Sequence, residues 1–248
     1  MTEQYGGFAY IYDRLMEDVD YGAWANYVEE LMTNDNRKPK KILELACGTG
    51  NITIPLANKG YRLTGVDISE DMLMVAKNKA IDSNQNVLFI QQDMVELEFD
   101  EKFDCVLAMC DGINYITEEI DLDKVFHNVY EVLEKDGLFI FDISSYYKLK
   151  HILGDNTFGE NLEDLCYLWE NYFNEDERII EMNLTFFIQE GSLYRKEEEY
   201  HIQRAYEIDE IMNLLNRNFK EIRVLDGFSL DAPKNNSERV FFIAKKSE

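Results

Sequence analysis

Two acids and two glycines in the first third of the sequence have the types and spacing of a ligand-binding site. Glu44 lies in the apolar run KILELA, Gly48 and Gly50 form the turn that follows it, and Asp67 comes 17 residues after Gly50. Glycine lets the backbone turn sharply and approach a ligand closely. An acid beyond such a turn can hydrogen-bond a ribose. The spacing predicts a ligand site at the carboxyl edge of a parallel sheet.

Three ligand classes compete for this turn. A nucleoside triphosphate requires GxxxxGK[ST], and no lysine follows Gly50 at the required place. A dinucleotide requires a glycine or alanine where Thr53 stands, and the carboxylate of Glu44 would oppose a bound pyrophosphate. S-adenosyl-L-methionine has no phosphate and carries a sulfonium and an ammonium, so an acid beside the turn favours it. Asp67 alone would suit a dinucleotide too.

Apolar periodicity places these residues in alternating strands and helices from about residue 41 onward. Strands separated by helices are typical of a parallel sheet covered on both faces. Strands are predicted at 41–46, 61–66, 87–91, 103–109 and 137–143, and helices at 8–17, 21–32, 51–59, 70–80 and 118–133. Thr117 is the expected N-cap of the last helix, and Gly137 releases the chain into the next strand.

Residues 146–205 follow a different pattern. The β-rich runs CYLWENYFN, RIIEMNLTFFIQ and LYRKEEEYHIQRA are separated by turn-like clusters, which predicts an antiparallel meander. A helix at 207–219 and strands near 221–227 and in RVFFIAKK then complete the α/β pattern. The predicted organisation is an N-terminal helical segment (1–39) that closes over the cofactor site, a core (40–145 and 206–248) and an inserted β lobe (146–205) that caps the acceptor site.

Together these features resemble the class I S-adenosylmethionine-dependent methyltransferases of the small-molecule type. The family's first motif, (E/D)xGxGxG, is matched by residues 44–50, ELACGTG, with Ala46 in place of the first glycine. The resemblance covers four segments between residues 41 and 143. It implies S-adenosyl-L-methionine as the cofactor and an α/β, Rossmann-like fold. In that fold a seven-stranded, mostly parallel sheet is flanked by helices, here with the antiparallel meander inserted.

The resemblance also implies the cofactor-binding residues. Asp67 would hydrogen-bond both ribose hydroxyls, and Asp93 and Met94, after the third strand, would contact the adenine amine and ring. These acids also have structural alternatives as caps or turn formers. The full set in the core is Glu44, Ala46, Cys47, Gly48, Gly50, Asp67, Ile68, Asp93, Met94 and Cys110.

The N-terminal segment YGGFAYIYDRLMEDVDYGAW resembles the part of small-molecule methyltransferases that folds over the donor. Tyr5, Tyr12 and Trp24 would then offer aromatic surface to the cationic donor. Arg14 would meet the donor carboxylate. An aromatic stripe at helical spacing is also typical of plain core packing, so both interpretations of these aromatic residues stay open.

The segment after the fourth strand, CDGINY, narrows the acceptor. It lacks the (D/N)PP(Y/F/W) motif of enzymes that methylate base amines or glutamine amides, and no proline precedes Cys110 as in carbon-5 pyrimidine methylation. A small-molecule acceptor with an N or O nucleophile is therefore expected, with Asp111, Asn114 and Tyr115 in its pocket. His201 is the one histidine nominated as a catalytic base, although its strand alternation also fits an exposed position.

Composition limits the partners. The chain of 248 residues has 49 acids and 25 basic residues, a net charge of −24, which disfavours nucleic acid and anionic membranes as partners. It shows no targeting segment and no apolar run of membrane length, so a cytoplasmic protein is expected. Four cysteines without ligand spacing predict reduced thiols and no metal site. The sequence does not predict an oligomeric state.

Two other functions remain compatible with the pattern. An NAD-dependent oxidoreductase would use Asp67 for its ribose, and a noncatalytic module could keep the donor fold as a scaffold or sensor. The intact set of Glu44, Gly48, Gly50 and Asp67 argues against a decayed site.

Overall fold

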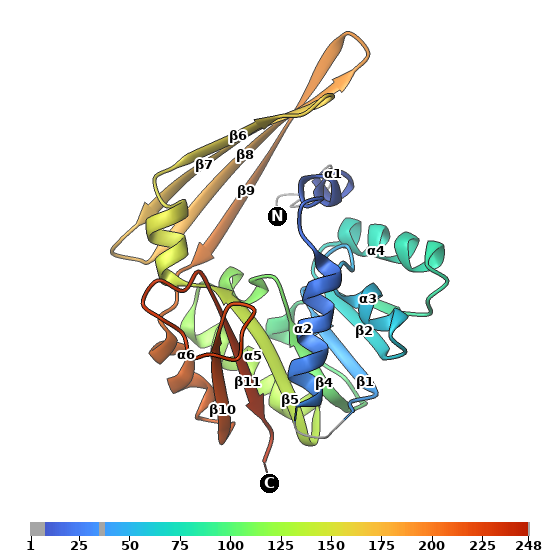
Figure 1. Ribbon diagram of the computed structural model, residues 1–248, viewed down its shortest axis with the longest axis vertical. Helices are drawn as coiled ribbons and strands as arrows, with labels where there is room; N and C mark the ends of the chain where they lie inside the picture. Colours follow the sequence, from blue (N-terminus) through green and yellow to red (C-terminus); the bar gives the residue numbers. More distant parts are fainter. Residues whose placement is uncertain (1–7, 35–37, 248) are drawn as a thin grey trace.

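The computed structural model describes residues 8–34 and 38–247, which form two sheets (Figure 1). The main sheet has seven strands in the order β10-β11-β5-β4-β1-β2-β3. The strands from β3 to β5 run parallel, and β11 is antiparallel to both β5 and β10. The bounds are β1 (Lys41–Leu45), β2 (Arg62–Asp67), β3 (Leu88–Gln91), β4 (Phe103–Ala108), β5 (Leu133–Ser144), β10 (Glu221–Asp226) and β11 (Arg239–Lys245). The predicted seven-stranded, mostly parallel sheet is confirmed.

Helices cover both faces of this sheet. One face packs against α2 (Tyr21–Thr33), α3 (Thr53–Asn58) and α4 (Glu70–Asp82), and the other packs against α5 (Glu119–Val132) and α6 (Ile208–Leu215). The central strands are apolar on both sides because both sides are covered. Ile42 therefore lies in one core and Leu43 in the other. No helix in the described part of the chain is long and apolar enough to cross a membrane.

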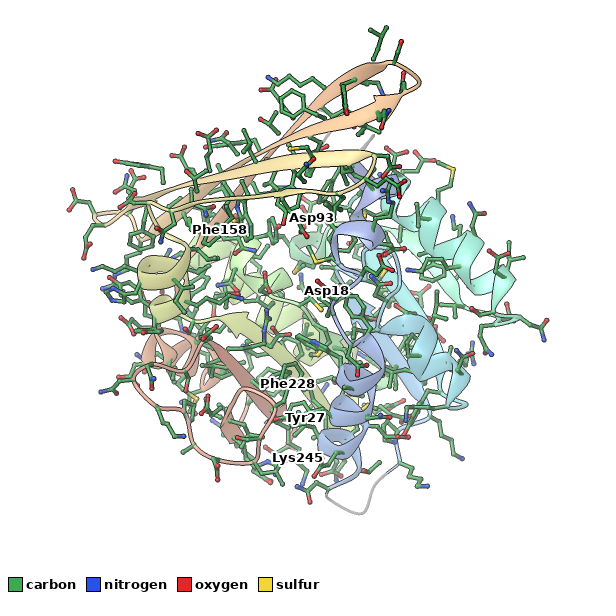
Figure 2. All side chains as sticks on the ribbon, turned by 45° about the horizontal axis from the view of Figure 1, so that its top comes forward. Asp18, Tyr27, Asp93, Phe158, Phe228 and Lys245 are labelled. Carbon is green, nitrogen blue, oxygen red and sulfur yellow. The ribbon has the colours of Figure 1, made fainter. Side chains whose placement is uncertain are left out.

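The inserted segment forms a separate antiparallel sheet over the carboxyl ends of the parallel strands (Figures 1 and 2). A π-helical turn, η3 (Lys148–Leu153), leads into it from β5. Its strands are β6 (Thr157–Asn161), β7 (Leu165–Asn174), β8 (Ile179–Glu190) and β9 (Leu193–Arg204). The sequence predicted β7 to β9 and missed β6, whose five residues are all exposed and carry no apolar alternation.

One buried amide joins the two sheets. Asn114 lies in the short helix η2 (Gly112–Tyr115), and its side chain donates to the carbonyls of Ser144 (3.0 Å) and Arg204 (2.9 Å). Its oxygen accepts from the Ser144 amide at 2.9 Å. Ser144 ends β5 and Arg204 ends β9, so this amide fixes both connections between the core and the inserted sheet.

Several boundaries differ from the prediction, and three of the differences have a structural explanation. Glu118, not Thr117, occupies the N-cap of α5, and the Thr117 carbonyl instead accepts a hydrogen bond from Arg204 (2.9 Å). Strand β5 starts at Leu133, before Gly137, because Leu133 already pairs with Phe103 of β4; the Asp136 amide then donates to the Lys246 carbonyl beyond β11. Helix α6 ends at Leu215, and residues 216–218 form a turn.

Candidate active site

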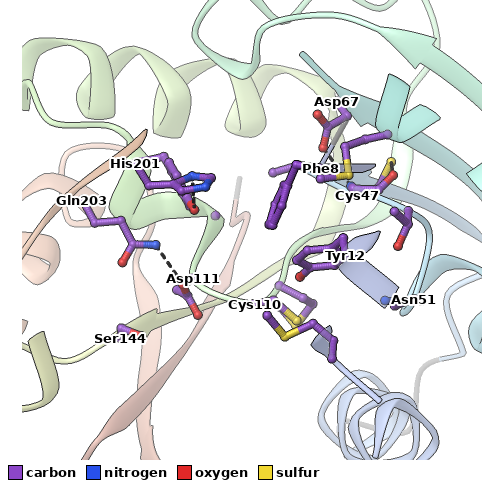
Figure 3. A pocket seen from close by; sticks show the side chains of 18 of the residues that line it. Phe8, Tyr12, Cys47, Asn51, Asp67, Cys110, Asp111, Ser144, His201 and Gln203 are labelled. Carbon is purple, nitrogen blue, oxygen red and sulfur yellow. Dashed lines mark hydrogen bonds between the residues drawn. The ribbon is translucent and has the colours of Figure 1, made fainter. Parts of the chain in front are cut away.

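A cavity of about 900 Å³ lies between the carboxyl ends of the parallel strands, helix α1 (Phe8–Leu15) and the inserted sheet. In Figure 3, Asp67 and Cys47 lie on one side, His201, Gln203 and Asp111 lie on the other, and Phe8 and Tyr12 stand between them. The predicted residues that line it are Tyr12, Trp24, Glu44, Ala46, Cys47, Gly48, Asp67, Ile68, Asp93, Met94, Cys110, Asp111, Tyr115 and His201.

The glycine turn and the acid of the next strand are joined directly. The Gly48 amide donates to Asp67 Oδ2 (2.8 Å), and the Ser69 amide donates to Asp67 Oδ1 (2.9 Å). Gly48 adopts φ +52°, and a Cβ built there would meet nothing within 4 Å, so the turn faces open space. Asp67 thus orients the turn and also lines the cavity at the end of β2.

Glu44 is buried beneath this turn. Its carboxyl accepts a hydrogen bond from the Thr53 hydroxyl at 2.5 Å, and it is 2% exposed. Burial raises the pKa of Glu44 to about 8, because the charged form is poorly solvated there. A cationic group bound in the cavity would favour the ionised form, since an opposite charge stabilises it.

Ala46, the departure from the family motif, is accommodated by a glycine on a neighbouring loop. Ala46 has a left-handed backbone with φ +49°, a conformation that favours glycine. Its methyl group lies where a side chain on Gly112 would be, because a Cβ at Gly112 would come within 2.9 Å of Ala46 Cβ. Gly112 follows β4, so the two loops that flank the cavity floor touch at this point.

Helix α1 is attached to the glycine turn through Asp13. Its Oδ1 accepts from Thr49 Oγ1 (2.7 Å) and Asn51 Nδ2 (2.9 Å), and its Oδ2 pairs with Lys79 of α4 (2.7 Å). Next to it, Arg14 pairs with Asp164 in the loop between β6 and β7 of the inserted sheet. Arg14 therefore contacts another part of the protein and not the cavity, unlike the expectation that it meets the donor carboxylate.

Aromatic residues of α1 reach the inserted sheet. The Phe8 ring lies 5.7 Å from that of Phe186 and 5.6 Å from that of His201, centroid to centroid. Burial raises the pKa of the Tyr12 hydroxyl well above its usual value, which keeps it neutral. Tyr5 lies outside the described residues. The aromatic segment thus forms one wall of the cavity and also packs against α4 and the inserted sheet.

A buried ion-pair network shapes the loop after β4. Cys110 and Asp111 both have left-handed backbones (φ 59° and 55°), and Asp142 of β5 accepts from their amides at 2.7 and 3.1 Å. Arg239 pairs with Asp142 and, at 2.9 Å, with Asp111. Gln203 donates to the other oxygen of Asp111 at 2.9 Å. Both oxygens of the Asp111 carboxylate are therefore engaged by protein groups.

Trp24 connects this network to the packed core. Its ring stacks beneath the Arg239 guanidinium (5.1 Å) and contacts Phe228 and Phe241. Figure 2 shows Phe228 beside Tyr27, which lies on the same helix, α2, as Trp24. Trp24 is 7% exposed, and it lines the cavity as well as packing against these residues.

His201 is buried on the cavity side of β9. It is 4% exposed, whereas the apolar neighbours Tyr200 and Ile202 are 43% and 37% exposed. The Tyr115 hydroxyl lies 3.2 Å from His201 Nδ1. Burial lowers the pKa of His201 to about 4, so the imidazole is neutral near pH 7. The alternative of an exposed strand histidine is wrong.

Two predicted residues lie outside the cavity lining. Gly50 has φ +77°, and a Cβ built there would lie 3.3 Å from side-chain atoms of Ala76 and Ile54. The glycine therefore allows the close contact between the turn and α4. Asn114 is fully buried in the hydrogen bonds between the two sheets. The sequence could not show whether these two residues line the cavity or pack inside the protein, because both lie in loops that were predicted to border the site.

Other lining residues were not predicted. Gln203 shares the alternation of His201 and could have been found from it. No sequence motif includes Lys148, Arg239 or the aromatic residues of the inserted sheet. These residues reach the cavity only in the folded chain. The lining residues missed from the sequence include Phe8, Lys148, Tyr167, Trp169, Phe186, Gln203 and Arg239.

The cavity fits S-adenosyl-L-methionine at the β1–β3 end. Glu44, Asp67 and Asp93 line this end, and the only described basic residues of the lining, Lys148 and Arg239, come from other elements. Asp93 caps the short helix η1 (Met94–Glu96) by accepting from the Val95 amide at 2.8 Å. Three acids and an open glycine turn suit a ligand with cationic groups and no phosphate. Fold and site together define a Rossmann-like methyltransferase.

Comparison with known proteins agrees with this class. A family model described as "Methyltransferase domain" matches residues 42–137. The chain is 40% identical over 245 residues to a putative methyltransferase of Geobacillus sp. (strain WCH70), covering 98% of this chain and 99% of that protein. It is 39% identical over 246 residues to the putative methyltransferase YqeM of Bacillus subtilis (strain 168), covering 98% of each.

Solved structures show the same architecture. The crystal structure of an S-adenosylmethionine-dependent methyltransferase from Clostridium acetobutylicum ATCC 824 matches with a TM-score of 0.90 and 35% identity, covering 98% of this chain and 99% of that one. The sugar N-methyltransferase KedS8 from Streptoalloteichus sp. matches with a TM-score of 0.83 at 16% identity, which shows the fold alone. The chain belongs to the class I S-adenosylmethionine-dependent methyltransferase family. It is a methyltransferase with S-adenosyl-L-methionine as its cofactor, which excludes the oxidoreductase alternative.

The contact between Ala46 and Gly112 predicts a coupled pair of substitutions. Gly112→Ala should lower the free energy of unfolding by about 1–3 kcal/mol, because the new methyl group overpacks the contact with Ala46. In an Ala46→Gly background the same change should cost much less, since its neighbour is gone. Urea denaturation of the wild type, both single variants and the double variant measures the coupling. Equal costs in the two backgrounds would contradict the contact.

The buried imidazole predicts a pH dependence of stability. Because the pKa of His201 is about 4 in the folded chain and about 6.5 when unfolded, the unfolded state binds the extra proton between these values. The contribution of the neutral His201 side chain to the free energy of unfolding is therefore fully present above pH 6.5, and it is lost as the pH falls through 4. Relative to His201→Phe, the wild type should lose up to about 3 kcal/mol of unfolding free energy between pH 7 and pH 4. Denaturation curves at several pH values test this, and a constant difference would refute it.

Proposed function

We propose that this methyltransferase transfers the methyl group to an N or O nucleophile of a small-molecule acceptor. The observation that supports this most is the shape of the site: the inserted sheet and α1 cover the carboxyl edge, and their side chains line the same cavity as the donor acids. A small molecule fits such a partly covered, mostly apolar cavity with a few polar groups. KedS8, which shares the fold, is itself a sugar N-methyltransferase.

The acceptor would lie between the inserted sheet and η2. The aromatic side chains of Tyr167, Trp169 and Phe186 offer flat apolar surface in the same cavity as Tyr115. When bound, S-adenosyl-L-methionine supplies an electrophilic methyl group on its sulfonium. The protein then has to hold a lone pair in line with that methyl and to exclude water, and the covering aromatic residues serve both purposes.

The Tyr115–His201 pair is the proposed route for a proton of the acceptor. A neutral imidazole can accept a proton or a hydrogen bond, and the 3.2 Å contact leaves Tyr115 able to relay between His201 and a bound nucleophile. The low pKa of His201 makes it a weak base, so its main contribution is to orient the nucleophile. Methyl transfer to a neutral amine or an ionised oxygen requires no stronger base.

The donor site is proposed to consist of Glu44 and the turn residues, with Asp67 for the ribose hydroxyls and Asp93 and Met94 for the adenine. Cys47, Gly48 and Ile68 border the same region. Asp67 already accepts two backbone hydrogen bonds, and a carboxylate oxygen can accept further ones from a ribose.

Loss of Asp67 should abolish both donor binding and transfer. S-adenosylhomocysteine at about 100 times its dissociation constant should add about 2.7 kcal/mol to the stability of the wild type and raise its melting temperature, but not that of Asp67→Ala. With labelled donor and a bacterial metabolite extract, label should appear in the low-molecular-weight fraction with wild type and not with Asp67→Ala.

Glu70→Ala is the matched control, because Glu70 is an exposed acid in the first turn of the adjacent α4. It should keep both the melting shift and the transfer. Label found only on macromolecules would overturn the small-molecule proposal, and an absent melting shift in the wild type would overturn the donor site.

We also propose that the N-terminal helical segment closes over the donor. Asp13 binds the side chains of the glycine turn while Phe8 and Arg14 contact the inserted sheet, so α1 bridges both walls of the cavity. Release of the donor product would then require α1 to leave the turn.

Asp13→Asn should therefore speed the dissociation of S-adenosylhomocysteine by about three- to tenfold, equivalent to about 0.7–1.4 kcal/mol. The substitution removes the ion pair with Lys79 and weakens the contacts with Thr49 and Asn51. Stopped-flow displacement measures the rate. Asp18→Asn, at an exposed acid just beyond α1, should leave it unchanged. An unchanged rate in Asp13→Asn would argue against a closing role for α1.

A further inference from the structure

Lys148 is a cavity-lining cation without a partner among the described side chains. It begins η3, four residues after Ser144 at the end of β5, and its backbone amide donates to Ser145 Oγ at 3.1 Å. No described carboxylate lies within ion-pair distance of its ammonium, and no side-chain hydrogen bond engages it. A partly desolvated charge without a partner is costly, so such a group calls for a ligand to compensate it.

The acids near Lys148 are committed to other groups. Asp142 accepts from the amides of Cys110 and Asp111 and pairs with Arg239. Asp111 is held by Arg239 and Gln203. Glu238, the third acid that acts on Lys148, is exposed. These acids oppose the effect of burial and of Arg239 on the lysine, and they help it to stay protonated without making a direct ion pair with it.

The distribution of charge along the cavity supports a role in recognition. The donor acids Glu44, Asp67 and Asp93 come from β1, β2 and the loop after β3, whereas Lys148 comes from the turn that enters the inserted sheet. Figure 3 shows Asp67 on one side of Phe8 and Tyr12, and His201, Gln203 and Asp111 on the other. Burial, followed by Arg239, lowers the pKa of Lys148, which places its ammonium in poorly solvated surroundings where an ion pair is strong.

We propose that Lys148 binds an anionic oxygen group of the acceptor, a carboxylate or a phosphate, and so selects acceptors that carry one beside an apolar or aromatic body. This inference rests on the proposed small-molecule methyl transfer and specifies its substrate class. The apolar body would pack on Trp169 and Met182, which line the same cavity. Lys148 acts in binding, and no step of the methyl transfer passes through it.

Matched aromatic probes test this proposal. Binding of benzoate, benzamide, phenyl phosphate and phenol to the full chain, saturated with S-adenosylhomocysteine, is measured by saturation-transfer NMR titration. At least one anion should bind more tightly than its neutral partner, and the carboxylate and phosphate arms show which group is preferred. Lys148→Met should weaken the preferred anion about tenfold, equivalent to about 1.4 kcal/mol. It should leave the neutral partner unchanged, and Lys148→Arg should retain most of the preference.

Lys77→Met is the matched control, because Lys77 is an exposed lysine of α4 outside the cavity lining. It should behave like the wild type and thereby exclude a general effect of net charge. The inference is overturned if neither anion binds better than its neutral partner, or if Lys148→Met keeps the preference. The melting shift with S-adenosylhomocysteine separates the two failures: its presence in Lys148→Met shows an intact donor site, whereas its absence from the wild type would refute the donor site itself.

Discussion

The buried carboxylate of Asp142 is the interaction on which the geometry of the site depends. It lies near the end of β5, is fully buried, and accepts from two consecutive amides of the loop after β4. Those amides belong to Cys110 and Asp111, whose left-handed backbones are strained for residues with side chains. Burial raises the pKa of Asp142, and the adjacent Arg239 opposes that shift. One carboxylate therefore holds a strained loop in place at the cavity floor.

This network extends from the core to the covering lobe. Asp111, once fixed, accepts from Gln203 of β9, and Asn114 a few residues later bonds the ends of both β5 and β9. The inserted sheet is thus positioned by the same loop that borders the donor site. On the opposite side, Asp13 gives α1 the equivalent attachment to the glycine turn. Both walls of the cavity are therefore attached to loops at the carboxyl edge of the sheet.

The sequence predicted the parts of this design that depend on local pattern. Alternating apolar runs predicted the sheet, and the spacing from Glu44 to Asp67 predicted residues that line one end of the cavity, because strand and turn geometry act over a few residues. The alternation in β9 left His201 open between the cavity and solvent, because its apolar neighbours Tyr200 and Ile202 are the exposed residues while His201 and Gln203 are buried. Lys148 and Arg239 lie 91 residues apart and meet only through sheet topology, so no spacing in the chain could reveal them.

The shifted pKa values of side chains in the cavity explain how such a site can work without a strong catalytic base. Burial is the first cause of the raised pKa of Glu44, the lowered pKa of His201 and the lowered pKa of Lys148. All three shifts therefore reflect poor solvation on both sides of the cavity. In such surroundings a cationic donor and an oriented lone pair interact strongly, because few water dipoles screen them. Burying these groups costs folding free energy, and in return the site is electrostatically preorganised. A methyl transfer depends more on such preorganisation than on a strong base.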